Sequence, residues 1–464
     1  MDQPTHPPTH PLSHAVTSPV DETVIATVPS ASLEEVDEAV ERAAEAAASW
    51  ASVAPGDRAR LLRRAAEAVD AAREELAALE VRNAGHTIAN ARAEAANVRD
   101  VLAYYSGAPE RHCGRQIPVA GGVDVTFYEP LGVVGVIVPW NFPMPIASWG
   151  FAPALAAGNC VVVKPAELTP LSALRIAELC HEAGIPEDVF QVVTGPGSTV
   201  GWRMVTHDKV RKICFTGSTE VGKRIMAGCA EQVKRVTLEL GGKSANIVFA
   251  DADLERAARS APTSVFDNAG QDCCARSRLL VERSVYDRFL SLLEPAVKAF
   301  KVKDPASPDA QMGPLISAEQ RRSVESYVTE DAPVAFSGTA PAGPGYWFPP
   351  TVLAPVSPDD RAAREEIFGP VLAVIPFGDE DEAVRIANDT PYGLSGSIWT
   401  NDVSRALRVA RAVETGTLSV NSHSSVRYST PFGGVKQSGL GRELGPDALG
   451  GFSEVKNVFI STQP

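Results

Sequence analysis

VVGVIVPWNFPMPIASWGFAPALAAGNCVVVKP, residues 133–165, contains two short apolar runs separated by a segment of helical length. Unbroken runs of Val and Ile are typical of strands that are buried on both faces. The order of strand and helix continues through VFQVVTG at 189–195, KICFTG at 212–217 and RVTLEL at 235–240. Strands separated by helices form a parallel sheet covered on both faces. We therefore predict an α/β fold that begins with a doubly wound domain of the nucleotide-binding type.

Two helices and a hairpin are predicted ahead of this stretch. Ser32 and Glu35 form a capping-box pattern before an Ala-rich amphipathic segment. A second helix is expected from about Asp57 to Glu80. Extended segments flank the Gly-Gly pair at 121–122, which predicts a hairpin.

A second α/β pattern follows residue 241. The strand candidates are RLLVE at 278–282, VLAVIPF at 371–377, SGSIWT at 395–400 and TLSVN at 417–421. The Pro- and Gly-rich run at 337–350 predicts a loop. The segment GFSEVKNVFIST at 451–462 predicts a final strand that has no strand near it in sequence.

Length and charge limit the class of protein. A chain of 464 residues exceeds one ordinary core, so two or three domains are expected. Lys and Arg number 43 against 57 Asp and Glu, which gives a net charge of −14 with no basic run. This balance disfavours nucleic acid and anionic membranes as partners, and no apolar stretch approaches the roughly 20 residues that span a bilayer.

The cysteines and the first residues indicate the compartment. Seven scattered cysteines are not the pattern of a disulfide framework, so a reducing cytoplasm is expected. Residues 1–20 lack the basic start and apolar core of a secretory signal, and their Pro, His and Thr content predicts a disordered lead-in. Its histidines could bind metal, but the interpretation as a tail is preferred and no metal site is predicted.

The segment NAGQDCCARSR at 268–278 places a candidate nucleophile beside an acid. A cysteine attacks as the thiolate, and small polar residues before Cys273 suit a tight loop whose N–H groups could face an oxyanion. Cys274 is interpreted as a small core residue. Asp272 would disfavour the thiolate if both side chains shared one apolar space, so they are expected to point apart. Asp272 then either hydrogen-bonds the loop or lines a substrate entrance.

Two other polar side chains follow buried strands. Asn141 in PWNFP carries an amide that can donate to an oxyanion, and Glu239 precedes two glycines at the end of an apolar strand. A carboxylate placed there is either ion-paired or a general base with a raised pKa.

Eight motifs, taken in sequence order, resemble the aldehyde dehydrogenase superfamily over nearly the whole chain. They are PWNFP, VVVKPAE, FTGSTEVGK, LELGGKSA, NAGQDCCA, EEIFGPVL, NDTPYGLSGS and PFGGVKQSGLGRE. The resemblance implies an aldehyde dehydrogenase-like fold, with a Rossmann-type cofactor domain, a second α/β catalytic domain and a small β oligomerisation flap. The implied ranges are 21–109 and 131–240 for the NAD-binding domain, 241–440 for the catalytic domain, and 110–130 with 441–464 for the oligomerisation region.

The resemblance also implies a mechanism. Cys273 would attack an aldehyde, while the Asn141 amide and the Cys273 N–H hold the oxyanion. Hydride transfer to a nicotinamide would leave a thioester, and Glu239 would activate the water that hydrolyses it. The presence of Glu239 favours hydrolysis over transfer of the acyl group to coenzyme A.

The implied cofactor is NAD, with NADP less favoured. Lys164 and Glu167 correspond to contacts with the adenosine ribose, and the Glu167 carboxylate would repel a 2′-phosphate. Gly217 and Ser218 lead into a helix whose N–H groups would face the pyrophosphate. The full set of implied cofactor residues is Ile137, Trp140, Lys164, Glu167, Gly197, Phe215, Gly217, Ser218, Val221, Leu240, Gly241, Glu366 and Phe368.

The substrate pocket is the least determined part. Gly150 occupies the place where the family commonly carries a lysine linked to proton relay. Pocket candidates are Trp149, Asp272, Val426 and Arg427. If Arg427 met a carboxylate and Asp272 an ammonium, a γ-glutamylated aminoaldehyde such as γ-glutamyl-γ-aminobutyraldehyde would fit, with betaine aldehyde or succinate semialdehyde as alternatives.

Two other classes remain as rivals, a cysteine hydrolase and a binding protein that has lost turnover. The hydrolase would need a histidine beside the cysteine, and His423 is the only one late in the chain. The resemblance implies a small-molecule aldehyde as partner and a homodimer or homotetramer, because the apolar final strand would otherwise be an unpaired edge.

Overall fold

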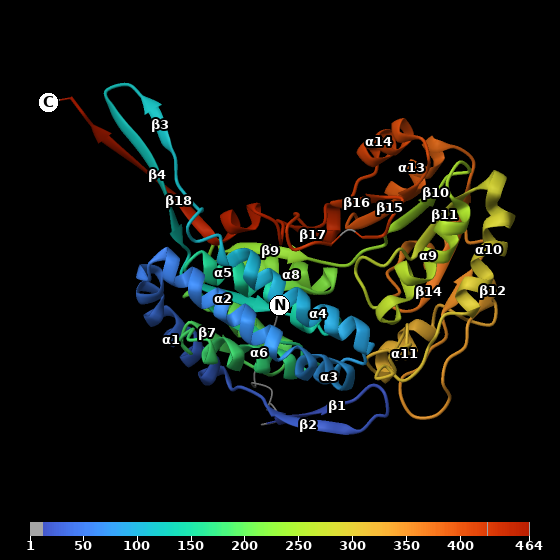
Figure 1. The fold of residues 1–464 in the computed structure, drawn as a ribbon, viewed down its shortest axis with the longest axis horizontal. Helices are drawn as coiled ribbons and strands as arrows, with labels where there is room; N and C mark the ends of the chain where they lie inside the picture. The colour runs from blue at the N-terminus through green and yellow to red at the C-terminus, as the bar shows by residue number, and fades with distance from the viewer. Residues whose placement is uncertain (1–12, 425, 464) are drawn as a thin grey trace.

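The computed structural model describes residues 13–424 and 426–463, and divides them between two α/β bodies and a projecting ribbon (Figure 1). Within this part of the chain no helix combines the length and apolar character needed to cross a membrane.

The first body is built on a six-stranded sheet in the order β17-β9-β8-β5-β6-β7. The predicted strands are present and parallel, with β17 as the antiparallel exception. Their bounds are β5 Val133–Ile137, β6 Cys160–Lys164, β7 Phe190–Val192, β8 Val210–Thr216, β9 Arg235–Glu239 and β17 Gly439–Leu440.

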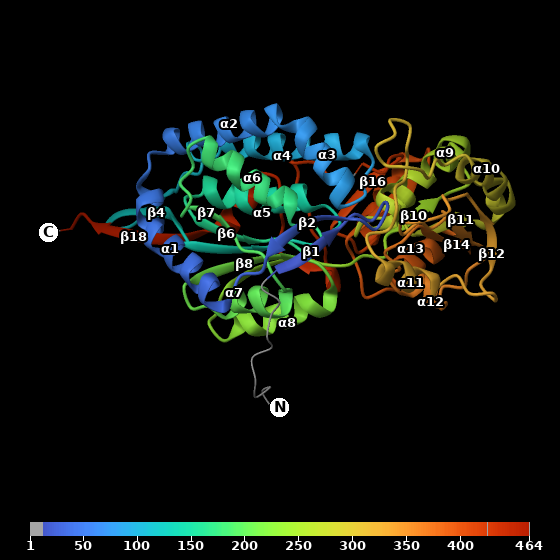
Figure 2. The same ribbon diagram turned by 90° about the horizontal axis from the view of Figure 1, so that it is seen from below.

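Helices cover both faces of this sheet, as the predicted alternation requires (Figure 2). On one side lie α2 Pro55–Ala71, α4 Ile88–Ser106, α5 Pro143–Ala156 and α6 Leu171–Glu182. On the other lie α1 Leu33–Ser52, α7 Trp202–Thr206 after the π-helix η1 Gly197–Gly201, and α8 Thr219–Ala230. The Ser32–Glu35 capping box at the start of α1 is confirmed. The single helix expected from Asp57 to Glu80 is wrong, because the chain breaks at Ala72 into α2 and α3 Arg73–Asn83.

The lead-in is corrected in part. Residues 1–12 lie outside the described residues, but β1 Ser13–Thr17 pairs antiparallel with β2 Val24–Pro29. His14 lies 3.0 Å from the Glu167 carbonyl oxygen and 3.3 Å from the Ser30 hydroxyl. Val16 is buried. These contacts order a segment whose composition predicted disorder.

The second body holds a seven-stranded sheet in the order β12-β13-β14-β11-β10-β15-β16. All four strands predicted from the sequence belong to it, and the loop predicted at 337–350 carries no helix or strand beyond Ser337. The strands are β10 Ala245–Val248, β11 Arg278–Glu282, β12 Val334–Ser337, β13 Thr351–Leu353, β14 Val371–Phe377, β15 Ser395–Trp399 and β16 Thr417–Val420.

Helices surround this second sheet, with short helical turns between elements. The helices are α9 Leu254–Phe266, α10 Tyr286–Lys298, α11 Ala318–Glu325, α12 Arg361–Arg364, α13 Glu380–Asn388 and α14 Val403–Ala412. The 3-10 turns of this body are η2 Asp267–Gly270 and η3 Arg283–Val285, whereas η4 Lys436–Ser438, which leads into β17, and η5 Asp447–Phe452, which packs against α5, belong to the first body.

The ribbon is a three-stranded antiparallel sheet in the order β18-β4-β3. The predicted hairpin forms from β3 Gln116–Val119 and β4 Gly122–Pro130, and the C-terminal strand β18 Ser453–Ser461 pairs along the length of β4. The ribbon projects away from both bodies (Figure 1).

Candidate active site

The candidate catalytic residues come from three separate elements. Asn141 follows β5, Glu239 is the last residue of β9, and Cys273 lies on the loop after α9 and η2. All three line one cavity of about 300 Å³, which we call the Glu366 cavity after the acid on its wall. Two strand ends and this loop thus bring together side chains from a span of 132 positions, Asn141 to Cys273.

Left-handed backbone shapes the loop that carries the nucleophile. Asn268 and Ala269 have φ values of 51° and 55°, which non-glycine residues rarely adopt. The Asn268 amide donates to the Asn141 backbone carbonyl at 2.8 Å, and the Asn141 amide donates to the Gln271 carbonyl at 3.0 Å. These two bonds hold the Asn141 amide against the loop, in position to serve a group on Cys273.

Asp272 does not point away from the thiols, and that expectation is wrong. One carboxylate oxygen of Asp272 and the sulfurs of Cys273 and Cys274 all lie within 4.8 Å of one another. The Cys274 N–H donates to the Asp272 carboxylate at 2.8 Å, because the tight turn folds this side chain back over its own loop. Asp272 also lines a cavity, so the two roles considered for it are both present.

The resting state of Cys273 is the thiol. Its contact with the Cys274 thiol, then burial, then the charge of Asp272 raise the pKa of Cys273 well above its ordinary value. Cys274 is buried, as expected for a small core residue. A proton acceptor must therefore act before Cys273 can attack.

Glu239 has the environment of a general base with a raised pKa. Only 2% of the residue is exposed, and neither carboxylate oxygen has a hydrogen-bond partner among the described residues. Burial first, and then the charge of Glu443, raise the pKa of Glu239 well above its ordinary value. No ion pair with Glu239 is seen among the described residues, and burial favours its uncharged form, as expected of a general base with a raised pKa.

A second cavity, of about 310 Å³, meets the first at the reacting residues. We call it the Trp149 cavity. Thr216, Glu239 and Cys273 line both cavities. Cys273 and Glu239 can therefore be reached through either cavity, and the residues that line the rest of the two cavities differ.

The Glu366 cavity brings together the residues expected around a nicotinamide. The Gly242 N–H donates to the Glu366 carboxylate at 2.9 Å, and Gly241 lies so close to Glu366 that a Cβ there would collide with it. The rings of Trp140 and Phe368 meet edge to face at 5.3 Å between centroids. Of the predicted cofactor residues, this cavity includes Trp140, Gly217, Ser218, Leu240, Gly241, Glu366 and Phe368.

The remaining predicted cofactor residues lie outside this cavity. Ile137 and Lys164 pack near η1, where a Cβ on Gly201 would contact both side chains and one on Gly197 would lie 3.9 Å from the Lys164 Nζ. Burial lowers the pKa of Lys164 to about 8. Glu167 follows β6 and is half-buried.

Close packing at the start of α8 leaves backbone exposed to a ligand. A Cβ on Gly217 would lie 2.6 Å from the ring of Phe215. The Ser218 side chain caps α8 by accepting from the Val221 N–H at 3.4 Å, and Val221 is 40% exposed. This helix terminus, with its unpaired N–H groups, fits a pyrophosphate.

The Trp149 cavity combines acids with aromatic rings. Trp149, Asp272 and Val426 line it, as the sequence predicts. Arg427 is exposed and does not line it, so its placement in the pocket is wrong: the segment reaches the cavity through Val426 and turns the next side chain toward solvent. Without Arg427, no cationic residue lines this cavity among the described residues.

Sequence reasoning missed most of this wall. The additional residues include Phe142, Phe432 and Asp267, and four from one face of α4, namely Asn90, Ala93, Glu94 and Asn97. The Trp149 indole N–H donates to Asn97 at 3.1 Å. The available signal was the three-and-four spacing of the polar residues Asn90, Glu94 and Asn97 along α4.

Gly150 is enclosed rather than open. A Cβ there would lie 2.7 Å from one methyl of Val136 on β5 and 3.1 Å from the other. A lysine at this position therefore cannot enter the described structure without movement of Val136.

No histidine of the described residues lines either cavity. His423 instead contacts Ser260 at 3.2 Å and Ser397 at 3.1 Å, and burial lowers its pKa to about 3. The arrangement needed by a cysteine hydrolase is thus not found here.

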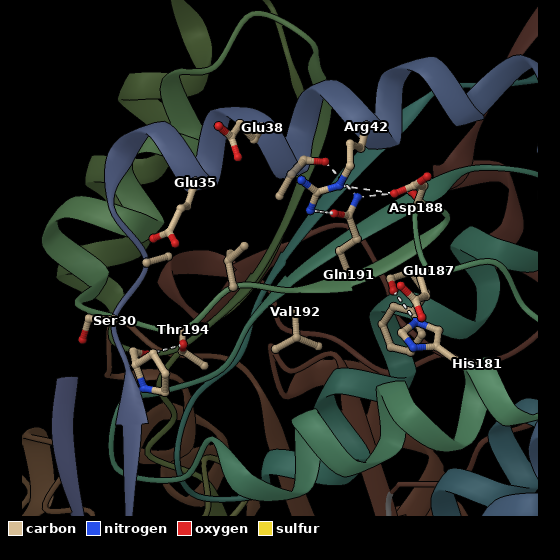
Figure 3. A pocket seen from close by; sticks show the side chains of 15 residues that line it. Ser30, Glu35, Glu38, Arg42, His181, Glu187, Asp188, Gln191, Val192 and Thr194 are labelled. Atoms are coloured by element: carbon tan, nitrogen blue, oxygen red, sulfur yellow. Dashed lines mark hydrogen bonds and ion pairs between the residues drawn. The ribbon is translucent and has the colours of Figure 1, made fainter. Parts of the chain in front are cut away.

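A larger hollow, of about 780 Å³, lies between α1 and β7 and contains none of the predicted site residues (Figure 3). Arg42 donates to Gln191 at 2.7 Å and pairs with Asp188 at 3.2 Å. These contacts hold α1 against the edge of the sheet, so the Arg42, Asp188 and Gln191 side chains that line the hollow already pair with one another.

The fold joins two α/β bodies, and one cavity brings Cys273 together with Asn141, Glu239 and the residues expected around a nicotinamide. The family model described as Aldehyde dehydrogenase family matches residues 8–458. This chain belongs to the aldehyde dehydrogenase family, a class of oxidoreductases that act on aldehydes.

Individual relatives are similar over most of the chain. A betaine aldehyde dehydrogenase of Bacillus subtilis is 42% identical over 425 residues, covering 89% of this chain and 87% of that protein. An aldehyde dehydrogenase of Emericella nidulans is 42% identical, covering 88% and 84%. The crystal structure of a Staphylococcus aureus betaine aldehyde dehydrogenase in complex with NAD+ matches with a TM-score of 0.95 at 38% identity, covering 97% and 92%.

Proposed function

We propose that this enzyme oxidises a small, positively charged aldehyde to its carboxylic acid, with NAD as the hydride acceptor and Cys273 as the nucleophile. The observation that carries the proposal is the meeting of Cys273, Glu239 and Thr216 at the boundary of two cavities of different character. One cavity suits a nicotinamide and the other a cationic aldehyde.

The residues divide the reaction into two steps. Cys273 gives its proton to solvent water and its sulfur forms a bond to the aldehyde carbon, whose carbonyl π electrons move to oxygen, while the Asn141 amide and the Cys273 N–H stabilise the oxyanion. When bound, NAD accepts the hydride of the substrate carbon, which leaves an acyl group on Cys273. Glu239 takes a proton from water, the hydroxyl adds to the thioester, and the sulfur leaves as the acid is released.

The cofactor assignment is supported by the site and by relatives. Gly241 with Glu366 and Gly217 with Phe215 form close-packed walls that side chains at the glycines would fill. The Glu167 carboxylate disfavours a 2′-phosphate, which supports NAD over NADP. Structures of PnpE and of the Staphylococcus aureus enzyme hold NAD at 40% and 38% identity to this chain.

The substrate is inferred from the wall of the Trp149 cavity. Asp267 and Asp272 supply negative charge, and Trp149, Phe142 and Phe432 supply aromatic faces. A cation over an aromatic face gains about 0.5–2 kcal/mol, more when desolvated. Because Arg427 is outside the cavity, a γ-glutamyl carboxylate has no partner there, so simple aminoaldehydes and betaine aldehyde are better supported than γ-glutamyl-γ-aminobutyraldehyde or succinate semialdehyde.

The experiment compares two aldehydes of one shape. Betaine aldehyde and 3,3-dimethylbutanal differ in a quaternary nitrogen against a quaternary carbon, so only charge distinguishes them. We expect kcat/KM to favour betaine aldehyde by at least about tenfold, or roughly 1.4 kcal/mol. γ-Glutamyl-γ-aminobutyraldehyde, succinate semialdehyde and propanal complete the series. Equal turnover of the two matched aldehydes would refute the charge argument.

The ribbon supports a homodimer or homotetramer. Phe127, Val455, Phe459 and Ile460 on its strands are each at least half exposed, at 50%, 59%, 51% and 53%. Large apolar side chains gathered on one projecting element mark an interaction surface. A light-scattering mass of 49.1 kDa, that of one chain, would contradict this assembly.

The free thiols support the cytoplasm as the compartment. All seven cysteines are free, and the proposed chemistry needs Cys273 reduced. A reducing cytoplasm meets that need.

A further inference from the structure

A buried ion pair lies at the start of α4. His86 directly precedes the capping residue Thr87, and its Nδ1 lies 2.8 and 3.0 Å from the two carboxylate oxygens of Glu94. Their side chains are 2% and 8% exposed. The pair links the residues before the helix to its second turn, so it fixes how α4 begins.

Other acids surround this histidine. A carboxylate oxygen of Glu80 on α3 lies within 4.8 Å of the ligand atoms of both His86 and Glu94, and Asp267 on η2 also acts on the ring. Burial alone would lower the pKa of His86, but the charge and hydrogen bond of Glu94, followed by the charges of Glu80 and Asp267, raise it to about 9. Burial raises the pKa of Glu80 to about 7. At neutral pH the ring is an imidazolium that donates to Glu94.

The ion pair touches the substrate wall on two sides. Glu94 itself lines the Trp149 cavity. The His86 ring centroid lies 5.7 Å from that of Phe142, which also lines the cavity and follows Asn141 directly. A shift of the pair would therefore move both a wall of the cavity and the residue next to the oxyanion donor.

The first turn of α4, one turn before Glu94, contacts the nucleophile loop. The Asn90 side chain donates to the Asp267 carboxylate. Asp267 is the first residue of the turn whose next two residues, Asn268 and Ala269, have positive φ. Such backbone persists only where surrounding contacts impose it, and the α4 contact is attached to its first residue.

We propose that His86 is a positioning residue for the reaction: as an imidazolium bound to Glu94 it fixes the first turns of α4, and through Asn90 and Asp267 it holds the turn that presents Cys273. Loss of its proton leaves the buried Glu94 carboxylate, with a carboxylate oxygen of Glu80 within 4.8 Å, without a counter-charge, which a buried carboxylate tolerates poorly. The proposal depends on Cys273 being the nucleophile. The Cys273→Ala variant tests that premise separately, since only failure of the premise leaves NAD reduction intact.

The test uses variants that change charge while keeping shape. His86→Gln keeps a donor for Glu94 without the positive charge, and His86→Gln/Glu94→Gln removes both charges. His181→Gln is the control, because His181 bonds the Phe190 carbonyl far from the site. Each is assayed from pH 7 to 10 with saturating NAD and propanal, a neutral aldehyde. Alkylation of Cys273 by iodoacetamide gives a second readout, and melting temperature a third.

The expected results separate positioning from simple stabilisation. Wild type and His181→Gln should lose kcat with an apparent pKa near 9. His86→Gln should lose about tenfold in kcat at pH 7.5, with little change in KM, and should lack that alkaline limb. The rate at which its Cys273 is alkylated should change by several-fold. The double variant should have a kcat and an alkylation rate close to those of wild type.

Two results would overturn the proposal. The first is a lower melting temperature of His86→Gln than of wild type, together with the same alkaline limb of kcat and the same rate of Cys273 alkylation. The His86–Glu94 pair would then be purely structural. One equivalent of a divalent metal in the purified enzyme, lost in His86→Gln, would show that Glu80, His86 and Glu94 hold a cation in place of the proton.

Discussion

Replacing Gly150 by alanine tests the packing of α5 on β5. The added Cβ would lie 2.7 and 3.1 Å from the methyls of Val136, where carbon atoms prefer about 3.5–4.0 Å. Both residues are buried, so neither can turn to solvent. Overpacking of this kind costs about 1–3 kcal/mol, against a gain of about 1 kcal/mol for alanine over glycine in a helix.

A double-variant cycle isolates the clash. Gly150→Ala should be less stable than wild type, whereas Val136→Ala/Gly150→Ala should be more stable than Val136→Ala, because the new methyl fills the space that valine leaves. The coupling should be about 2 kcal/mol, read from guanidinium midpoints followed by tryptophan fluorescence. Additivity within about 0.5 kcal/mol would refute the close contact. A lysine at position 150 should likewise be tolerated only with Val136→Ala.

Three further outcomes follow from the site. Glu239→Gln should show a burst of NADH followed by turnover slowed by about 10²–10⁴, because the acylation step does not need the base but hydrolysis of the thioester does. In the wild type, the rate of deacylation should rise with pH as Glu239 ionises. Equal burst and steady-state rates in the variant would contradict this. Cys274→Ala should lower the pKa of Cys273 and speed its alkylation at pH 8, since the Cys274 contact is the main cause of the raised value, while an unchanged rate would remove that cause. The pKa of His86 is about 9 in the folded chain against about 6.5 in the unfolded chain. Protonation of His86 therefore contributes about 3 kcal/mol to the free energy of unfolding, fully below pH 6.5, and this contribution is lost as the pH rises through 9. The urea midpoint of wild type should fall between pH 6.5 and 9, and that of His86→Gln should stay level.

The sequence predicts elements best where local signals agree. The helix predicted after Gly217 and Ser218 is α8 Thr219–Ala230, which begins there because Ser218 caps it and an amphipathic pattern follows. The unbroken Val runs likewise predict β5 and β6. The break at Ala72 has no Pro or Gly to announce it; Ala72 is buried there and has φ −89° and ψ 8°.

What the sequence could not show depends on contacts between distant residues. β1 exists because His14 reaches the Glu167 carbonyl and Val16 is covered, neither of which composition reveals. Arg427 is adjacent to a pocket residue in sequence, but its side chain faces solvent. The chemistry of Cys273 could be predicted because a motif carries it, whereas the acids of α4 and η2 around it form no motif.

The two cavities that meet at Cys273 also bear on inhibition. If the proposed function holds, the aldehyde and the dinucleotide reach the sulfur through separate cavities, and of the described residues only Thr216, Glu239 and Cys273 line both. A compound bound in the Trp149 cavity would therefore not compete with NAD, and its inhibition constant should not depend on the NAD concentration. An inhibitor with two linked groups, one in each cavity, would have to pass Thr216, so the longest and widest linker that still binds would report the width of the passage between the cavities.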